Sequence, residues 1–277
     1  MAFWEWVRRA ANLSNHAYSD STAPPGFSRL PGSVSDANTG FAASAFQHRS
    51  GQVWISFRGT NDAQDWHANA GLASQALGRG PSDMLRQQMD QAQAFTESVR
   101  RQFGNEVHFT GHSLGGGLAQ IEAARTGMQA QVFNAAPVRA VIESANFPNA
   151  NLDLIHNHNR SGDPITALGD IVNGHVGHKW TYADTEGRGF SINGKPAADH
   201  EIFGGALERA VLGWDQDGFS GAIKGFLSGR AQELTDARSP VFEQLHQHNM
   251  DAIVFDANES NFKPMDYDPF AGTHSGG

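Results

Sequence analysis

The pentapeptide GHSLG at residues 111–115 places a serine hydroxyl between two glycines, in the pattern G-x-S-x-G. In that pattern the serine occupies a sharp turn between a strand and a helix, from which it can attack acyl groups. The flanking sequence fits this setting, because residues 107–110 are predicted to form a strand and the small residues after Ser113 a helix that runs to Gly127. Glycines at both ends of the pentapeptide leave no Cβ where strand and helix must cross closely. The pattern predicts that Ser113 is a nucleophile. The alternative is a glycine-rich turn whose serine takes no part in catalysis.

A serine hydroxyl becomes a good nucleophile only when a base takes its proton and an acid orients that base. For a nucleophile on this kind of turn, the chain order is Ser, then Asp or Glu, then His. Asp163 follows a predicted strand at residues 152–158, and Pro164 disfavours helical geometry at Asp163, which keeps it in the connecting loop. Asp163 is therefore the candidate acid, and a simple turn-capping aspartate is the alternative.

The candidate base is less well determined, because the chain contains 13 histidines. Three of them follow Asp163 in suitable surroundings. His175 and His178 come shortly before a predicted strand at residues 179–182, and His200 comes directly before a predicted helix at 201–211. Spacing alone leaves these three candidates nearly equal.

The elements that must position these groups alternate along the chain. Helical spacing of apolar residues predicts helices over residues 3–18 and 82–103, and a polar, proline- and glycine-rich stretch at 20–39 is predicted to be a loop. The predicted strands cover residues 41–48, 52–57, 107–110, 131–135, 152–158 and 179–182, the first two as a hairpin. This alternation predicts an α/β fold with a mostly parallel central sheet flanked by helices. We expect one domain over residues 1–212 and a C-terminal extension over residues 213–277.

Composition narrows the class of protein. The 277-residue chain has no cysteine, which excludes disulfides, thiolate metal sites and a cysteine nucleophile. A net charge of −9 disfavours nucleic acid as a partner and attraction to anionic lipid surfaces. No run approaches the roughly 20 apolar residues of a transmembrane segment. Charged residues interrupt the first apolar stretch, so a Sec signal peptide is not expected. The sequence predicts a protein that is cytoplasmic as synthesised, or exported by a route that uses no Sec signal.

Four segments taken together resemble the class 3 lipase family of the α/β hydrolases. They are VWISFRGT at residues 53–60 with the following Asp65-Trp66, VHFTGHSLGGGLA at 107–119, FNAAPV at 133–138, and GDPI at 162–165. The resemblance covers about residues 40–212 and leaves the C-terminal extension unmatched. The family is associated with triacylglycerol lipases, feruloyl esterases and phospholipases that remove the sn-1 acyl chain.

The resemblance implies roles for residues that spacing alone left open. It implies Ser113 as nucleophile, Asp163 as acid and His200 as base. In the family, a His-x-Gly stretch before a strand, here residues 175–177, is not catalytic, and the base precedes an aromatic residue, as in HEIFG at residues 200–204.

The resemblance also implies an oxyanion hole and a lid. The backbone N–H of Thr60, with a contribution from its hydroxyl, and the backbone N–H of Leu114 would hold the oxyanion. Residues 61–80 correspond to the lid region of the family. The apolar residues of this region that we expect to face a lipid are Trp66, Leu72 and Leu77.

The sequence therefore predicts a carboxylic ester hydrolase that acts on lipid acyl esters, triacylglycerol or phospholipid, through a Ser-His-Asp triad and an acyl-enzyme. No metal or organic cofactor is required for that chemistry. The expected partner is a lipid or small ester substrate, with peripheral contact to a lipid interface. Two alternatives remain: a phospholipase effector delivered to other cells, and a non-catalytic lipid- or partner-binding protein on a hydrolase scaffold.

Overall fold

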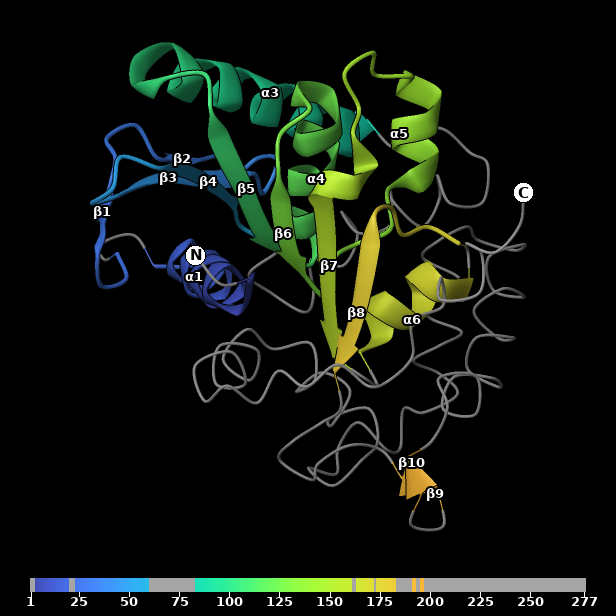
Figure 1. Ribbon diagram of the computed structural model, residues 1–277. Helices are drawn as coiled ribbons and strands as arrows, with labels where there is room; N and C mark the ends of the chain where they lie inside the picture. Colours follow the sequence, from blue (N-terminus) through green and yellow to red (C-terminus); the bar gives the residue numbers. More distant parts are fainter. Residues whose placement is uncertain are drawn as a thin grey trace, which may run out of the picture.

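An eight-stranded sheet lies at the centre of the computed structural model (Figure 1). The structure describes residues 3–19, 23–59, 83–160, 163–171 and 173–182, and the backbone of residues 191–192 and 195–196. The strands of the sheet are β1 (Phe27–Arg29), β2 (Val34–Ser35), β3 (Ala42–His48), β4 (Val53–Phe57), β5 (Val107–His112), β6 (Ala130–Phe133), β7 (Ile155–Arg160) and β8 (His178–Tyr182). A separate two-stranded pair consists of β9 (Ser191–Ile192) and β10 (Lys195–Pro196).

The direction of the strands determines which residues share an edge of the sheet. The order is β1-β3-β4-β5-β6-β7-β8, with β2 also paired to β3. Strands β1, β2 and β4 pair with β3 in antiparallel fashion, and all pairs from β4 to β8 are parallel. The C-terminal ends of β4, β5, β6, β7 and β8 therefore meet at one edge, which is where open α/β sheets bind ligands.

Helices cover both faces of the sheet (Figure 1). The helices are α1 (Phe3–His16), α3 (Asp83–Phe103), α4 (Leu114–Thr126), α5 (Arg139–Ala145) and α6 (Pro164–Ile171). Helix α4 packs on β4, β5 and β6 and against α3, and α1 packs on the opposite face across the same three strands. None of the helices in the described ranges is long and apolar enough to cross a membrane.

Each face of the sheet has its own apolar core, because successive side chains of a strand point to opposite faces. On the α3–α4 face, Ile55 and Phe109 are fully buried, together with Leu118 of α4. On the α1 face, Val7 and Leu13 of α1 pack against the aromatic side chains Phe46, Trp54 and Phe133. The helical spacing at the N-terminus thus predicted the helix and the burial of Val7, whereas Trp4 is 41% exposed.

The structure differs from the expected elements in places. The predicted loop at residues 20–39 contains β1 and β2, which gain their hydrogen bonds by pairing with β3. Residues 152–154 form a 3-10 turn, so β7 begins later than expected and runs to Arg160. Helices α5 and α6 were not predicted, because they are short and lie in polar or mixed sequence. Pairing across the sheet and packing on its faces decide such short elements more than local composition does. The expected domain boundary at residues 212–213 lies outside the described residues.

Candidate active site

Ser113 adopts a backbone conformation that is rare for a residue with a side chain. It lies between β5 and α4 with φ 57° and ψ −127°. Such sparsely populated conformations persist only where the surrounding structure fixes them, and they cluster at functional sites. Here the Ser113 N–H donates to the Phe133 carbonyl at 3.1 Å, and the Ser113 carbonyl accepts from the N–H groups of Gly117 at 3.1 Å and Ala136 at 3.0 Å. The turn expected of a nucleophilic serine is present.

The glycines of the motif are required by close backbone contacts. A Cβ at Gly111 would lie 2.4 Å from the Gly115 carbonyl oxygen, and a Cβ at Gly115 would lie 2.2 Å from the Phe57 carbonyl oxygen. A Cβ at Gly116 would lie 2.7 Å from that of Ala135. The prediction that strand and helix cross too closely for larger residues is confirmed, and the helix also abuts the end of β4.

The N-terminus of α4 is a source of hydrogen-bond donors beside Ser113. Leu114 is the first residue of this helix, so the first amides have no carbonyl acceptor within the helix. Aligned peptide dipoles also give this end a partial positive charge. The N–H of Leu114 therefore lies on the residue next to Ser113 and at the helix end that favours an oxyanion.

The end of β4 reaches the nucleophile from the other side. A Cβ at Gly59 would lie 2.7 Å from the His112 carbonyl oxygen and 3.1 Å from Ser113 Cβ, so the chain at residue 59 passes directly beside the turn. Thr60, the predicted oxyanion residue, is the next residue along the chain and lies outside the described residues. The contact explains why glycine occupies residue 59, because any side chain there would collide with the turn.

Asp163 lies just beyond the C-terminal end of β7, at the same edge of the sheet as Ser113. It is 1% exposed, and its Oδ1 accepts from the Thr166 N–H at 2.7 Å. Asp163 thus caps α6, in which Pro164 is the first residue. The capping role that the sequence offered as an alternative is real. The cap engages Oδ1, and a carboxylate can accept hydrogen bonds at both of its oxygens.

His178 is too far from Ser113 to serve as its base. It is the first residue of β8, pairs with His156 at the start of β7, and stacks on that ring. Through the registers of β6 and β7, His112 stands level with Trp180. Neighbouring strands lie about 4.8 Å apart and each residue rises about 3.3 Å, so His178 is about 14 Å across the sheet and about 10 Å along it from Ser113.

His175 is held against α6 by its own contacts. The ring is 9% exposed, its Nε2 donates to the Thr166 carbonyl at 3.1 Å, and Asp170 Oδ1 lies 3.5 Å from the same nitrogen. A Cβ at Gly169 would collide with the ring. Burial lowers the pKa of His175, against the opposing effect of Asp170. The Nε2 nitrogen of His175 is thus engaged by a backbone carbonyl of α6, which favours a structural role for this ring.

The other residues predicted for the site, His200 and the lid residues Trp66, Leu72 and Leu77, lie outside the described residues. Of the groups that are described, the structure brings Ser113, the Leu114 amide and Asp163 to one edge of the sheet, and it places the end of β4 beside the nucleophile.

Sequence reasoning missed Tyr18, which touches both sides of this site. Its hydroxyl lies 2.9 Å from His112 Nδ1 and accepts from the Gly59 N–H at 3.1 Å. Burial raises the pKa of Tyr18, so the hydroxyl keeps its proton. No local signal could have identified it, because 94 residues separate Tyr18 from His112.

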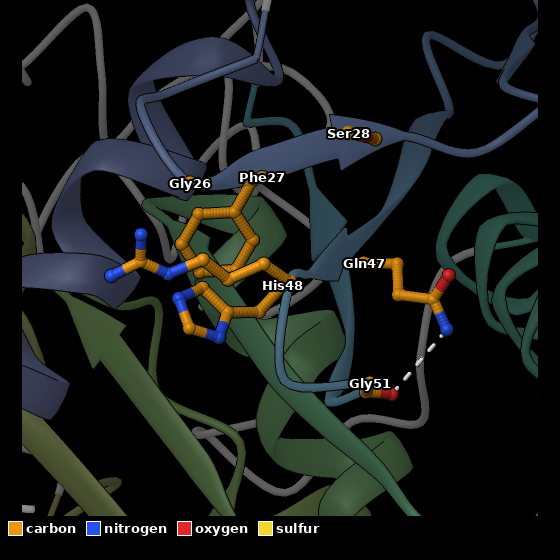
Figure 2. A pocket seen from close by; sticks show the side chains of 7 residues that line it. Gly26, Phe27, Ser28, Gln47, His48 and Gly51 are labelled. Atoms are coloured by element: carbon orange, nitrogen blue, oxygen red, sulfur yellow. Dashed lines mark hydrogen bonds between the residues drawn. The ribbon is translucent and has the colours of Figure 1, made fainter.

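A surface hollow lies far from these residues, at the β1–β3 edge of the sheet (Figure 2). It is lined by Gly26, Phe27, Ser28, Gln47, His48, Arg49 and Gly51. Its polar groups serve the adjacent turn: His48 Nδ1 bonds Ser50 Oγ at 2.7 Å, and the Gln47 side chain donates to the Gly51 carbonyl. Two strands, β3 and β4, separate β1 from β5 in the sheet, so the hollow is not part of the candidate active site.

Comparison with known proteins identifies a curated relative of the chain. The chain is 32% identical to the extracellular phospholipase A1 of Serratia liquefaciens over 171 residues, which are 58% of this chain and 51% of that protein. The chain thus spans about half the length of this curated relative.

Solved structures resemble the chain more distantly. A triacylglycerol lipase from Penicillium expansum aligns with 66% of this chain and 80% of its own at 16% identity, with a TM-score of 0.47. Another triacylglycerol lipase, whose catalytic centre is described as a serine protease triad, aligns with 65% of this chain and 80% of its own at 15% identity, with a TM-score of 0.43. At these TM-scores the likeness adds nothing to the architecture described above.

The family model described as a phospholipase-like, Tle-like phospholipase domain matches residues 9–199, which is more than half of the chain. The matched range includes residues 9–16 of α1, the whole eight-stranded sheet, Ser113 and Asp163. The chain belongs to the family of Tle-like phospholipase domains.

Proposed function

We propose that the chain is a phospholipase that hydrolyses an acyl ester of a glycerophospholipid through an acyl-enzyme on Ser113. The observation that carries the proposal is the strained turn at Ser113, held at the C-terminal end of β5 and next to the N-terminus of α4. A chain that had kept the scaffold only for binding would have no need to keep this turn, its nucleophile and the buried Asp163 together.

In the proposed reaction His200 takes the proton of Ser113 as the hydroxyl attacks the ester carbonyl. The N–H groups of Thr60 and Leu114 stabilise the oxyanion, and such donors each lower a barrier by about 3–4 kcal/mol. His200 then protonates the departing lysophospholipid alcohol, and afterwards activates the water that releases the fatty acid. Asp163 holds the imidazole in the required tautomer.

The choice of phospholipid over triacylglycerol comes from the family and from the Serratia relative, which is named a phospholipase A1. Cleavage at the sn-1 position is the corresponding proposal for this chain. We also propose that residues 61–80, with Trp66, Leu72 and Leu77, form a lid that contacts the lipid interface. We propose too that the protein acts outside the cell that makes it, as the relative named extracellular does.

The test compares the full chain with its Ser113→Ala variant on vesicles of a phosphatidylcholine that carries palmitate at sn-1 and oleate at sn-2. The expected result is release of palmitate by the wild type and a loss of at least about 10³-fold in kcat for the variant. Tributyrin and a series of longer esters provide the comparison for a lipase. Equal rates for wild type and variant would remove the mechanism, and faster hydrolysis of triacylglycerol would reassign the substrate.

A further inference from the structure

Helix α1 and the turn that follows it lie along β5 and contact the three side chains that this strand presents to the α1 face. Near the start of the strand, the ring of Trp6 meets that of His108, with centroids 4.5 Å apart. In the middle, Ser14 Oγ lies 2.8 Å from Thr110 Oγ1.

Tyr18, just after the helix, makes the third contact, with His112 at the end of the strand. The helix therefore follows the strand to the residue that precedes the nucleophile.

The turn that carries Tyr18 is itself fixed. The guanidinium of Arg29 in β1 donates to the carbonyls of His16 and Ser19 and to Ser44 Oγ in β3. The same guanidinium lies 4.9 Å from the ring centroid of Phe46. Because the turn is held both by α1 and by the edge of the sheet, the position of the Tyr18 hydroxyl is determined by the fold and not by the active site.

That hydroxyl joins two segments that belong to different halves of the candidate oxyanion hole. It accepts from the N–H of Gly59, one residue before Thr60, and it bonds the side chain of His112, one residue before Ser113. Because the Tyr18 hydroxyl is protonated, it can accept from Gly59 and donate its own proton to His112 Nδ1. One oxygen atom therefore bridges the end of β4 and the residue before the nucleophile.

We propose that Tyr18 is a positioning residue for acyl transfer, which fixes the oxyanion donor at residue 60 relative to the nucleophile at residue 113. The proposal rests on the function proposed above. Tyr18 acts through Gly59 and His112 and touches no substrate. Oxyanion donors are effective only within about 2.7–3.1 Å of the developing charge, and a displacement of about 1 Å lowers rates by about 10²-fold.

The experiment compares Tyr18→Phe with Ser14→Ala in the full chain, on the phosphatidylcholine vesicles described above. Both substitutions remove one hydroxyl that ties α1 to β5, but only Tyr18 contacts the nucleophile turn. For Tyr18→Phe we expect kcat to fall by about 10- to 100-fold with KM changed by less than about twofold. For Ser14→Ala we expect kcat within about twofold of the wild type.

A second readout does not depend on activity. Amide hydrogen exchange should show faster exchange at Gly59 in Tyr18→Phe than in the wild type and in Ser14→Ala. If Tyr18→Phe does not fold, the pair His112→Gln and His112→Leu replaces it. The first keeps a side-chain partner for the hydroxyl and should retain more activity than the second.

The outcomes separate cleanly. Wild-type kcat in Tyr18→Phe, equal losses in Tyr18→Phe and Ser14→Ala, or an unchanged Gly59 amide would each overturn the positioning role while leaving the phospholipase proposal intact. If the wild type itself releases no more fatty acid than Ser113→Ala, the proposed function fails, and the role of Tyr18 in acyl transfer fails with it.

Discussion

The two ends of β5 carry similar residues for different purposes. At its start, His108 lies between the rings of Trp6 and Trp54, at centroid distances of 4.5 and 5.0 Å. At its end, His112 also meets an aromatic residue from the α1 region, but through a hydrogen bond to the Tyr18 hydroxyl, and the next residue is the strained Ser113. The first histidine packs, and the second takes part in a network around a nucleophile.

The comparison extends to the histidines outside β5. Burial lowers the pKa values of His108 and His156 to about 4, and holds that of His158 well below its usual range. His158 bonds the Tyr182 hydroxyl and Gln131 Oε1, each at 2.6 Å, within the sheet. Histidines that the sequence cannot distinguish from a base therefore have architectural roles where aromatic or polar neighbours bury and hold their rings.

The largest expected effect is on kcat, and it distinguishes His200, the proposed base, from His175, the alternative candidate. His200→Ala should lower kcat as much as Ser113→Ala does, by at least about 10³-fold, because both groups act in the same proton transfer. His175→Ala should leave the kcat of folded enzyme within about tenfold, because its Nε2 binds the Thr166 carbonyl. Steady-state kinetics on both variants make the comparison, and the reverse ranking would show that His175 is the base.

The next effect concerns the two carboxylates near α6. Asp163→Asn should lower kcat by about 10²- to 10³-fold, less than loss of the base, because the amide retains an acceptor for the Thr166 N–H but no longer stabilises an imidazolium. Asp170→Asn, which alters the contacts to Lys179 and His175, is the matched control and should retain kcat within about threefold. Similar losses in both variants would remove the special role of Asp163.

The nucleophile turn should also differ from ordinary turns in its tolerance of a methyl group. Gly115→Ala should lower the free energy of unfolding by about 3 kcal/mol or more, because its Cβ would lie 2.2 Å from the Phe57 carbonyl oxygen. Gly104→Ala, with φ 113° and nothing within 4 Å of its Cβ, should lower it by only about 1–2 kcal/mol. Urea denaturation measures both, and equal losses would contradict the tight crossing.

The smallest effect is on the pH dependence of stability at the start of β5. The pKa of His108 is about 4 in the folded protein and about 6.5 when unfolded, so the unfolded state binds more protons between these values. The free energy of unfolding should therefore fall as pH falls from 6.5 toward 4. His108→Leu should reduce the slope of this free energy against pH by the amount that corresponds to uptake of at most one proton. His156, whose pKa burial also lowers, still contributes to the slope in this variant. Denaturation at several pH values tests this, and an unchanged slope would contradict a neutral buried His108.

The alternating pattern of the sequence predicted the main strands, α1 and α3, because each follows a period that local residues set. The motif around Ser113 and the small residues after it predicted α4, which is buried on all sides. The sequence also predicted the Ser113 turn from local residues, because the glycines that permit the turn lie within two residues of Ser113. It could not predict β1 and β2, whose hydrogen bonds come from β3, or separate His175 and His178 from the base by spacing.

Sequence by itself thus determined the parts of this protein whose causes are local: the helical stripe, the buried strands, and a turn that only glycines allow. The tertiary structure decided which polar residues share the active edge, because strand direction and register place Asp163 beside that edge and His178 away from it. It also decided the role of Tyr18, since only the packing of α1 along β5 brings its hydroxyl to Gly59 and His112.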